Sequence, residues 1–187
     1  MKPVIFWLPL NGIEQEIILP PEYVESTMLP AVEHEAGHIV AAHHFGARVL
    51  GISVGFIPEQ NQRGMFFQAI YAWKDWSVET ECIVKAAGPA ADLLYQGKLD
   101  EKAVSMDLQD IRELSGIASL EPYLSLAKSV FEQYPDEFKC VVSALRKSID
   151  SDEERTLGRL PNGRIGALLL DEAELMQCLG NSKETPC

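Results

Sequence analysis

The sequence predicts a single α+β domain that is mostly α-helical with a small β-sheet. Residues that start and stop helices bound several long segments after residue 21, whereas segments rich in Val, Ile and Phe lie near the N-terminus and between residues 48 and 71. No internal repeat or low-complexity tract divides the chain, and 187 residues suit one domain with a substantial core. We therefore expect one domain over residues 1–187.

The N-terminal segment, residues 1–21, is expected to be a β-hairpin extension of this domain. Two apolar stretches, Val4–Leu10 and Ile13–Leu19, flank Asn11 and Gly12, a pair that tolerates the positive φ angles of a tight hairpin turn. Two prolines follow the second stretch and end the hairpin.

The central part, residues 22–118, begins with a helix and two strands. The helix is expected from about Glu22 to Phe45, bent or restarted at Pro30, with Gly46 after its end. Strands are expected over Arg48–Ile57 and over residues 64–71, because both are rich in β-branched and aromatic residues. The polar segment 59–63 is expected to be the loop between them.

Two further helices are predicted in the central part. Ser77 is a good N-cap for a helix that carries acidic residues in its first turn, reaches Tyr95 and stops at Gly97. Residues 98–104 are expected to form a loop. Ser105 is then expected to cap a helix that runs from residue 106 to about residue 115.

The C-terminal part, residues 119–187, is expected to be helical. Pro122 and Pro135 mark the starts of two helices that end near Lys147, because proline is favoured in the first helical turn. Residues 151–163 are polar and rich in turn formers. A last amphipathic helix is expected over residues 167–179.

Composition excludes some classes of partner. A net charge of −12 argues against nucleic acid, because phosphates bind clusters of Lys and Arg. No apolar run reaches the roughly 18 residues of a membrane span, so we expect no direct membrane insertion and a cytoplasmic protein. The cysteines form no Cys-x-x-Cys pair and are too sparse for a disulfide framework, so we expect core or surface thiols at Cys82, Cys140, Cys178 and Cys187.

The pattern His34-Glu35-Ala36-Gly37-His38 indicates a metal site. On a helix, residues i and i+4 lie about 40° apart around the axis, so the two histidines direct their imidazoles to one point. Nitrogen ligands hold zinc there at about 2.0–2.1 Å. Glu35 projects about 100° from His34, beside the metal, where it can hydrogen-bond water and act as a base. We therefore predict that His34 and His38 bind Zn²⁺ and that Glu35 is catalytic.

The third ligand has to come from another segment, because a catalytic zinc site has three protein ligands and one open position. Asp92 and Asp107 are the main candidates, and Asp110 is a weaker one. His43 and His44 lie at about 180° and −80° from the first histidine. They point away from the metal and are expected to be packing or surface residues.

The order and spacing of these residues resemble the peptidase domain of the FtsH-type AAA zinc metalloproteases. The likeness covers about residues 30–118: the His-Glu-x-x-His motif is followed by Ala-Gly-Pro-Ala-Ala-Asp-Leu at 87–93 and Ser-Met-Asp-Leu at 105–108. The family has roughly Gly-Gly-Arg-x-Ala-Glu-Glu and then Ser-Asn-Asp-Leu. The resemblance implies that Asp107 is the third zinc ligand. The chain departs from the family's arginine, glutamate and asparagine at Pro89, Asp92 and Met106.

The resemblance also implies a zincin-type metallopeptidase fold. The chain has no Gly-x-x-x-x-Gly-Lys loop for ATP phosphates, so we expect an ATP-independent zinc metalloendopeptidase that acts on flexible or unfolded polypeptides. The strand residues Gly64, Met65, Phe66 and Phe67 are a candidate edge for pairing with the substrate backbone. A plain core strand is the open alternative. A homo-oligomer or a separate ATPase is the assembly that the resemblance suggests.

Two alternative functions stay open. A regulatory peptidase would use the same chemistry on one specific protein partner. A non-catalytic adaptor would bind zinc and a peptide without cutting it. Glu35 argues against the adaptor, because a purely structural zinc site needs no base at that position.

Overall fold

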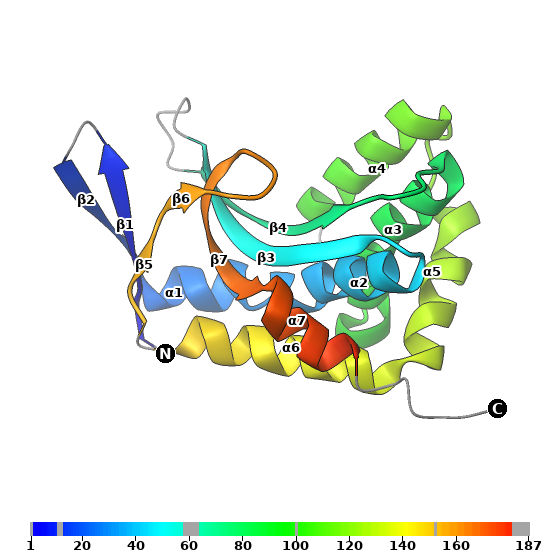
Figure 1. Cartoon of the computed structure of the whole chain (residues 1–187). Helices are drawn as coiled ribbons and strands as arrows, with labels where there is room; N and C mark the ends of the chain where they lie inside the picture. The colour runs from blue at the N-terminus through cyan, green and yellow to red at the C-terminus, as the bar shows by residue number, and fades with distance from the viewer. Residues whose placement is uncertain (1, 11–12, 58–63, 100, 152, 181–187) are drawn as a thin grey trace.

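The computed structural model of the chain describes residues 2–10, 13–57, 64–99, 101–151 and 153–180 (Figure 1). Its helices are α1 (Pro21–Tyr23), η1 (Val24–Met28), α2 (Ala31–His44), α3 (Val78–Ala91), η2 (Asp92–Gln96), α4 (Glu101–Ser115), α5 (Glu121–Gln133), α6 (Pro135–Asp150) and α7 (Glu172–Leu179), of which η1 and η2 are π-helical. Its strands are β1 (Val4–Leu10), β2 (Ile13–Leu19), β3 (Arg48–Ile57), β4 (Gly64–Ala72), β5 (Arg155–Thr156), β6 (Gly158–Arg159) and β7 (Ile165–Asp171). The mostly helical α+β class is confirmed, with two small sheets in place of one.

The smaller sheet contains the predicted N-terminal hairpin. β1 and β2 pair antiparallel along their whole length, and β5 adds to β1 in parallel. The predicted turn residues Asn11 and Gly12 lie outside the described residues. This sheet projects from one end of the molecule, away from α4 and α5 (Figure 1).

The larger sheet has the strand order β4-β3-β7-β6, and all its neighbours are antiparallel. Strands β3 and β4 match the sequence prediction, whereas the loop expected over residues 59–63 lies outside the described residues. The helix predicted over residues 167–179 is wrong in its first half. Residues 165–171 form β7, because their apolar run is long enough to pair with β3 and is buried by the layers around it. Asp171 then caps the shorter helix α7 with a capping box to Glu174.

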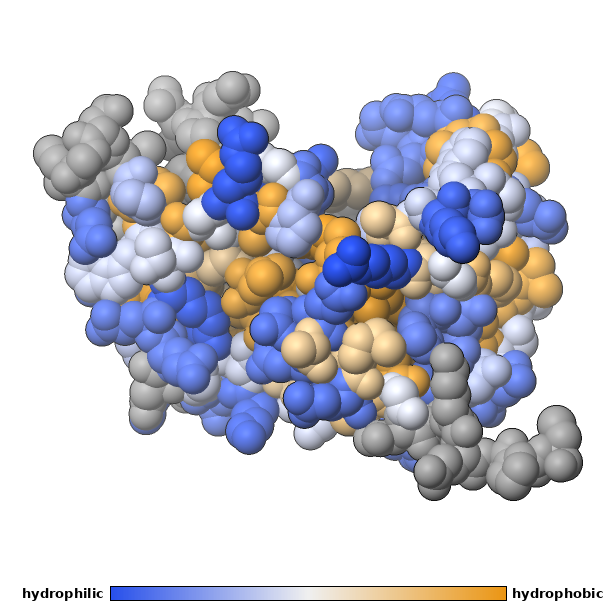
Figure 2. Space-filling model, viewed as in Figure 1, coloured by the Kyte–Doolittle hydropathy of each residue, from blue (hydrophilic) through white to orange (hydrophobic). Residues whose placement is uncertain are grey.

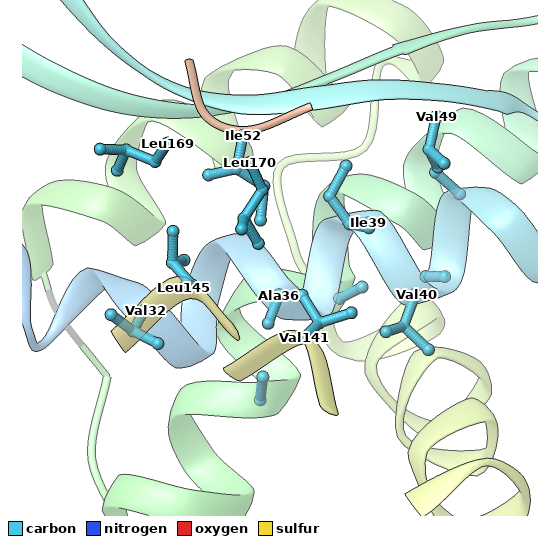
Figure 3. Close-up of a cluster of buried hydrophobic side chains, with 14 of the residues drawn as sticks. Val32, Ala36, Ile39, Val40, Val49, Ile52, Val141, Leu145, Leu169 and Leu170 are labelled. Atoms are coloured by element: carbon cyan, nitrogen blue, oxygen red, sulfur yellow. The ribbon is translucent and has the colours of Figure 1, made fainter. Parts of the chain in front are cut away.

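Helix α2 lies at the centre of the core. Every residue from Val32 to Ala42 is buried, which fits a helix whose apolar residues are not confined to one face. The sheet covers one side of α2 and α6 covers another (Figures 1 and 3). The side chains at this junction include Val32, Ile39, Val40, Val49, Ile52, Val141, Leu145, Leu169 and Leu170.

The helix boundaries confirm some of the sequence signals and correct others. Ser77 caps α3 by accepting a hydrogen bond from the Thr80 N–H at 3.1 Å. Gly46 and Gly97 have φ angles of 88° and 70°, as residues after a helix end often do. The loop expected over residues 98–104 is correct at residues 98–99 but wrong from residue 101, where α4 already begins, so the cap expected at Ser105 is also wrong. Residues 101–104, Glu-Lys-Ala-Val, contain strong helix formers.

Two of the cysteines are not thiols. Cys140 of α6 and Cys178 of α7 form a disulfide, with their Cα atoms 5.3 Å apart. The prediction failed because it relied on Cys-x-x-Cys spacing, whereas these residues are 38 positions apart and meet only when α7 packs on α6. Cys82 is a buried free thiol, as expected, and Cys187 lies outside the described residues. None of the described helices is both long and apolar enough to cross a membrane.

Candidate metal centre

The candidate site forms where α2, α3 and α4 meet beneath β4. Glycines allow α2 and α3 to approach closely. A Cβ atom at Gly37 of α2 would lie 2.5 Å from the Ala87 carbonyl oxygen of α3. A Cβ atom at Gly88 of α3 would lie 2.5 Å from the Nε2 atoms of both His34 and His38. The backbone of α3 therefore borders the space in front of the two imidazoles.

Both histidines are held in one orientation through their Nδ1 atoms. His38 Nδ1 lies 2.7 Å from the Val84 carbonyl oxygen, and His34 Nδ1 lies 2.8 Å from Asp92 Oδ2. A carbonyl or carboxylate oxygen can only accept a hydrogen bond, so each Nδ1 carries the proton. In the neutral form of each ring, the Nε2 atom then has a free lone pair, and both Nε2 atoms face the same point, 3.1 Å apart.

Asp107 supplies the third group. Its Oδ2 lies 3.0 Å from His34 Nε2, and its Oδ1 lies 3.5 Å from His38 Nε2. The ligand atoms of His34, His38 and Asp107 all lie within 4.8 Å of one another, and all three residues are buried. Among the described residues, three His, Cys, Asp or Glu side chains could together hold one metal ion, and these are His34, His38 and Asp107.

The other two aspartates that the sequence left open have different partners. Asp92 contacts the far side of the His34 ring, and Gln96 holds it by donating to Asp92 Oδ1 at 3.2 Å and to the Pro30 carbonyl oxygen at 2.8 Å. Asp92 therefore orients the imidazole of His34, a candidate metal ligand. Asp110 pairs with Lys85 at 2.6 Å.

The site needs a positive charge at its centre. Asp107 Oδ2 is buried and has no hydrogen-bond donor when both Nε2 atoms are unprotonated. Burial alone lowers the pKa of His34, but its hydrogen bonds to Asp107 and Asp92 and the charge of Glu35 outweigh that effect and raise the pKa to about 10. Burial opposes ionisation of Asp107, yet the facing histidines hold its pKa well below the usual range. A proton or a metal cation satisfies this arrangement.

The spacing of these atoms fits a zinc ion. Two ligand atoms at about 2.0–2.1 Å from a tetrahedral zinc lie about 3.3 Å apart. The corresponding separations here are 3.1 Å between the two Nε2 atoms and 3.0 Å between His34 Nε2 and Asp107 Oδ2. Two imidazoles and one carboxylate are also the donor set of known catalytic zinc sites, which leave a fourth position open. Only small adjustments separate the observed positions from coordination.

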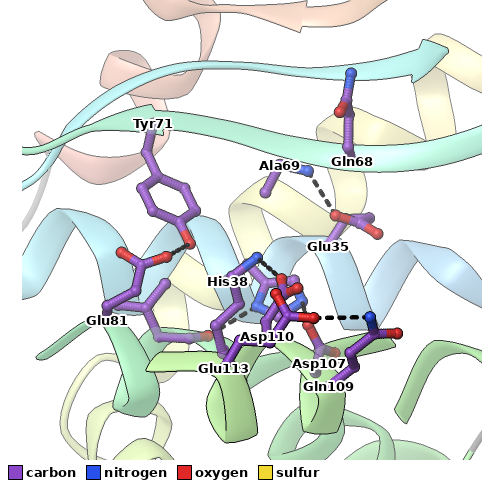
Figure 4. A network of polar contacts seen from close by, with 12 residues as sticks. Glu35, His38, Gln68, Ala69, Tyr71, Glu81, Asp107, Gln109, Asp110 and Glu113 are labelled. Atoms are coloured by element: carbon purple, nitrogen blue, oxygen red, sulfur yellow. Dashed lines mark hydrogen bonds and ion pairs between the residues drawn. The ribbon is translucent and has the colours of Figure 1, made fainter. Parts of the chain in front are cut away.

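Glu35, the predicted base, lies next to this group and under the sheet (Figure 4). Its Oε2 accepts a hydrogen bond from the Ala69 N–H of β4 at 2.6 Å, and the side chain is buried. The His38 and Asp107 side chains lie on the other side of Glu35 from β4 in this view. One carboxylate oxygen is therefore anchored by the sheet.

Three polar residues beside the site were missed by the sequence analysis. Tyr71 of β4 donates to Glu81 Oε1 at 2.9 Å (Figure 4). Lys85 of α3 pairs with Asp110 at 2.6 Å. Burial and the Glu81 carboxylate raise the pKa of Tyr71 well above its ordinary value, so its hydroxyl stays protonated. No spacing rule links a strand tyrosine to a helix 10 residues later, so the sequence contained no signal for this contact.

The four residues proposed to bind substrate, Gly64, Met65, Phe66 and Phe67, lie on β4, the outer strand of the larger sheet in the described part of the chain. The Ala69 N–H points away from β3, because it bonds to Glu35. Hydrogen-bonding direction alternates along an antiparallel strand, so the N–H and C=O groups of Phe67 and Met65 also face away from β3. This edge position is compatible with pairing to a substrate backbone, and the alternative of a plain core strand stays open.

His43 and His44 take no part in the metal centre. His44 Nε2 lies 2.6 Å from Glu137 Oε2 of α6, and the imidazole stacks on Tyr134 at 3.4 Å between ring centroids. The prediction that His44 is a packing residue is confirmed.

The chain matches no model of a known protein family, and no curated protein matches it.

Proposed function

We propose that this chain is a zinc-dependent metallopeptidase with a zincin-type fold, related in its site to the FtsH-type peptidases. The observation that carries the proposal is the position of Glu35. A carboxylate lies beside a buried His34-His38-Asp107 group and is anchored to the edge of a sheet. A purely structural metal site has no use for a free carboxylate at that place.

Each residue has a distinct task in this proposal. His34, His38 and Asp107 would hold the zinc ion, and Asp92 would fix the tautomer and orientation of His34. When bound, zinc polarises a scissile carbonyl and makes water more acidic. Glu35 accepts the proton of the attacking water and passes it to the leaving nitrogen.

The edge of β4 is the proposed substrate platform. The outward-facing N–H and C=O groups at Met65 and Phe67 offer hydrogen bonds to an extended chain. Because Ala69 anchors Glu35 two residues further along, a peptide on this edge passes close to the base. In the space-filling view, the outline is notched between the side that carries β6 and the side that carries α4, and β4 runs below this notch (Figures 1 and 2).

This platform suits a polypeptide that is already extended, flexible or unfolded. No nucleotide-binding loop is present in the sequence, so unfolding would depend on a separate ATPase or would not be required. The regulatory peptidase, which cuts one specific partner, shares this chemistry. The adaptor that binds a peptide without cutting is the weaker candidate, because metal and peptide binding do not require a carboxylate beside the His34-His38-Asp107 group.

The test compares wild-type protein with Glu35→Gln, using unfolded casein as the substrate and measuring new amino termini. The amide is nearly the same size as the carboxylate but cannot accept the water proton. We expect one zinc per chain in both proteins, hydrolysis by the wild type that a strong chelator abolishes, and no hydrolysis by Glu35→Gln. Glu132→Gln, an exposed change on α5, is the matched control and should retain activity. Zinc binding without hydrolysis of any peptide by wild-type protein would favour the adaptor.

A further inference from the structure

Arg164 lies above β4 on the face of the sheet opposite α2. It belongs to the connection between β6 and β7, and its Nη1 donates to Gln68 Oε1 of β4 at 3.1 Å. Its guanidinium carbon lies 5.4 Å from the centre of the Phe66 ring. Gln68 is itself held by a hydrogen bond from its Nε2 to Ser53 Oγ at 3.2 Å. Gln68 and Phe66 thus position the guanidinium of Arg164, and Ser53 holds Gln68 in place.

The backbone is built to let Arg164 reach across the sheet. The Phe66 ring occupies the space above Gly55 of β3, where a Cβ atom would lie 2.2 Å from the ring. The connection is closed by two hydrogen bonds, from the Arg164 N–H to Asn162 Oδ1 at 3.2 Å and from the Leu160 N–H to the Arg164 carbonyl oxygen at 2.8 Å. The side chain therefore reaches over β3 toward the outer strand, where it meets the side chains of Phe66 and Gln68.

Arg164 is a cation without a carboxylate partner among the described residues. The described ion pairs of arginine join Arg48 to Glu172, Arg146 to Glu33 and Arg155 to Glu153, and none involves Arg164. The chain has 28 acidic and 16 basic residues, so acidic partners are abundant. An exposed guanidinium whose only described contacts are an amide and an aromatic ring keeps its capacity for a carboxylate.

The position of Arg164 relates directly to a peptide on the β4 edge. Side chains alternate along β4, so those of Gln68 and Phe66 lie on the Arg164 face, whereas Phe67, Ala69 and Tyr71 pack toward the core. In an added strand, the residue opposite Gln68 projects its side chain to the same face, with Cβ atoms about 5 Å apart. An Asp or Glu side chain at that position would project to the same face as the guanidinium.

We propose that Arg164, held by Gln68 and Phe66, forms a substrate subsite that selects an acidic side chain. This inference rests on the proposed peptidase function and adds a preference that the zinc chemistry does not require. Gln68 is next to Ala69, the residue that anchors Glu35, so the selected residue lies close in sequence to the bond that is cut. Arg164 is a specificity-determining residue in this proposal and takes no part in bond cleavage.

The experiment measures kcat/KM for a set of peptides derived from one casein cleavage site. Each residue within three positions of the cleaved bond is replaced in turn by Asp, Asn or Lys. For wild-type protein, we expect one position at which Asp is preferred over Asn by about fivefold, the scale of an exposed ion pair. The preference should shrink as salt increases. Arg164→Gln should remove it, and Arg164→Glu should reverse it in favour of Lys.

The control is Lys128→Glu, the same charge change at an exposed site on α5. It should leave the preference unchanged, which separates a local contact from the field of the whole molecule. Cleavage of the neutral Asn peptides by Lys128→Glu should match that by wild-type protein. If wild-type protein and Arg164→Glu cleave the Asp, Asn and Lys peptides with the same relative rates, the subsite does not exist. If no peptide is cleaved although zinc is bound, the proposed function itself fails, and the subsite with it.

Discussion

Gly88 gives the sharpest test of where the metal lies. Gly88→Ala adds a single methyl group on α3, at a position where the Cβ atom would be 2.5 Å from the Nε2 atoms of both His34 and His38. The backbone of Gly88 is helical, a conformation that alanine favours in general but less so before a proline such as Pro89. The substitution therefore acts through the space in front of the two imidazoles.

The size of the effect follows from these distances. Ordinary contact begins at about 3.4 Å, so each ring would have to move by about 0.9 Å to accommodate the methyl group. Zinc–ligand distances in a working site vary by only about 0.2 Å. Loss of a group that merely orients a ligand weakens metal binding about 10–100-fold. Displacing two ligands at once should weaken zinc binding by more than about 100-fold.

The fold should survive this change. Before Pro89, alanine loses part of its usual advantage of about 1 kcal/mol over glycine in a helix, and overpacking typically costs about 1–3 kcal/mol. The metal-free variant should therefore be destabilised by no more than about 3 kcal/mol relative to the metal-free wild type. Circular dichroism and urea unfolding after chelation measure this difference.

The assay is zinc content together with competition against a chelator of known affinity. Gly158→Ala is the matched control, because a Cβ atom there meets nothing within 4 Å. It should bind one zinc with wild-type affinity. If Gly88→Ala is folded and also binds one zinc with wild-type affinity, the metal does not lie between the Nε2 atoms of His34 and His38, and the assignment of the centre is wrong.

Three further predictions test the ligands, the charge and the core. Asp107→Ala should lower zinc affinity far more than Asp92→Asn, for which a loss of about 10–100-fold is expected. If competition titrations show the reverse order, Asp92 is the zinc ligand and Asp107 is the group that orients a ligand. Zinc binding at pH 7 should release about one proton per chain, because the pKa of His34 in the metal-free protein is raised from 6.5 to about 10 and the imidazole is protonated at pH 7. Zinc affinity should therefore increase as pH rises from 6.5 to 8.5. Calorimetry in buffers of different ionisation enthalpy measures the proton release, and a finding of none would contradict this prediction. Leu145→Ala should lower the free energy of unfolding by about 2–5 kcal/mol, and a loss below 1 kcal/mol in urea titrations would show that α6 is not packed on α2 as described.

The same raised pKa sets a direction for the stability of the metal-free protein. His34 binds a proton more tightly when folded than when unfolded, so its contribution is fully present below pH 6.5 and is lost as pH rises through about 10. In the proposed centre, zinc would take the place of that proton. The chelated protein should therefore lose stability between pH 7 and pH 10, whereas zinc-loaded protein should be less affected over that range.

What the sequence by itself determined is local. The spacing of His34 and His38 places two imidazoles on one face of any helix that contains them, whatever surrounds that helix. The cap at Ser77 and the glycines after α2 and η2 likewise depend on neighbours only a few residues away, and they occur as expected. These signals are reliable because helical geometry relates residues within one or two turns.

Only the tertiary structure decided which distant residues complete the site. Asp92 and Asp107 are 58 and 73 residues from His34, and local spacing does not distinguish a ligand from a group that orients one. The packing of α3 on α2 through Gly37 and Gly88 places Asp92 behind the ring and leaves Asp107 in front of it. The resemblance to a family's motif pointed to Asp107, but the geometric reason lies in that packing.

The same cause explains the errors in the fold. The apolar run from Ile165 to Leu170 has no strict periodicity and fits a buried helix as well as a buried strand. It became β7 because the edge of β3 was available for pairing. The disulfide between Cys140 and Cys178 and the contact of Arg164 with Gln68 arise in the same way. Each joins segments that are far apart in sequence, and their proximity is set by the packing of whole elements and not by the residues alone.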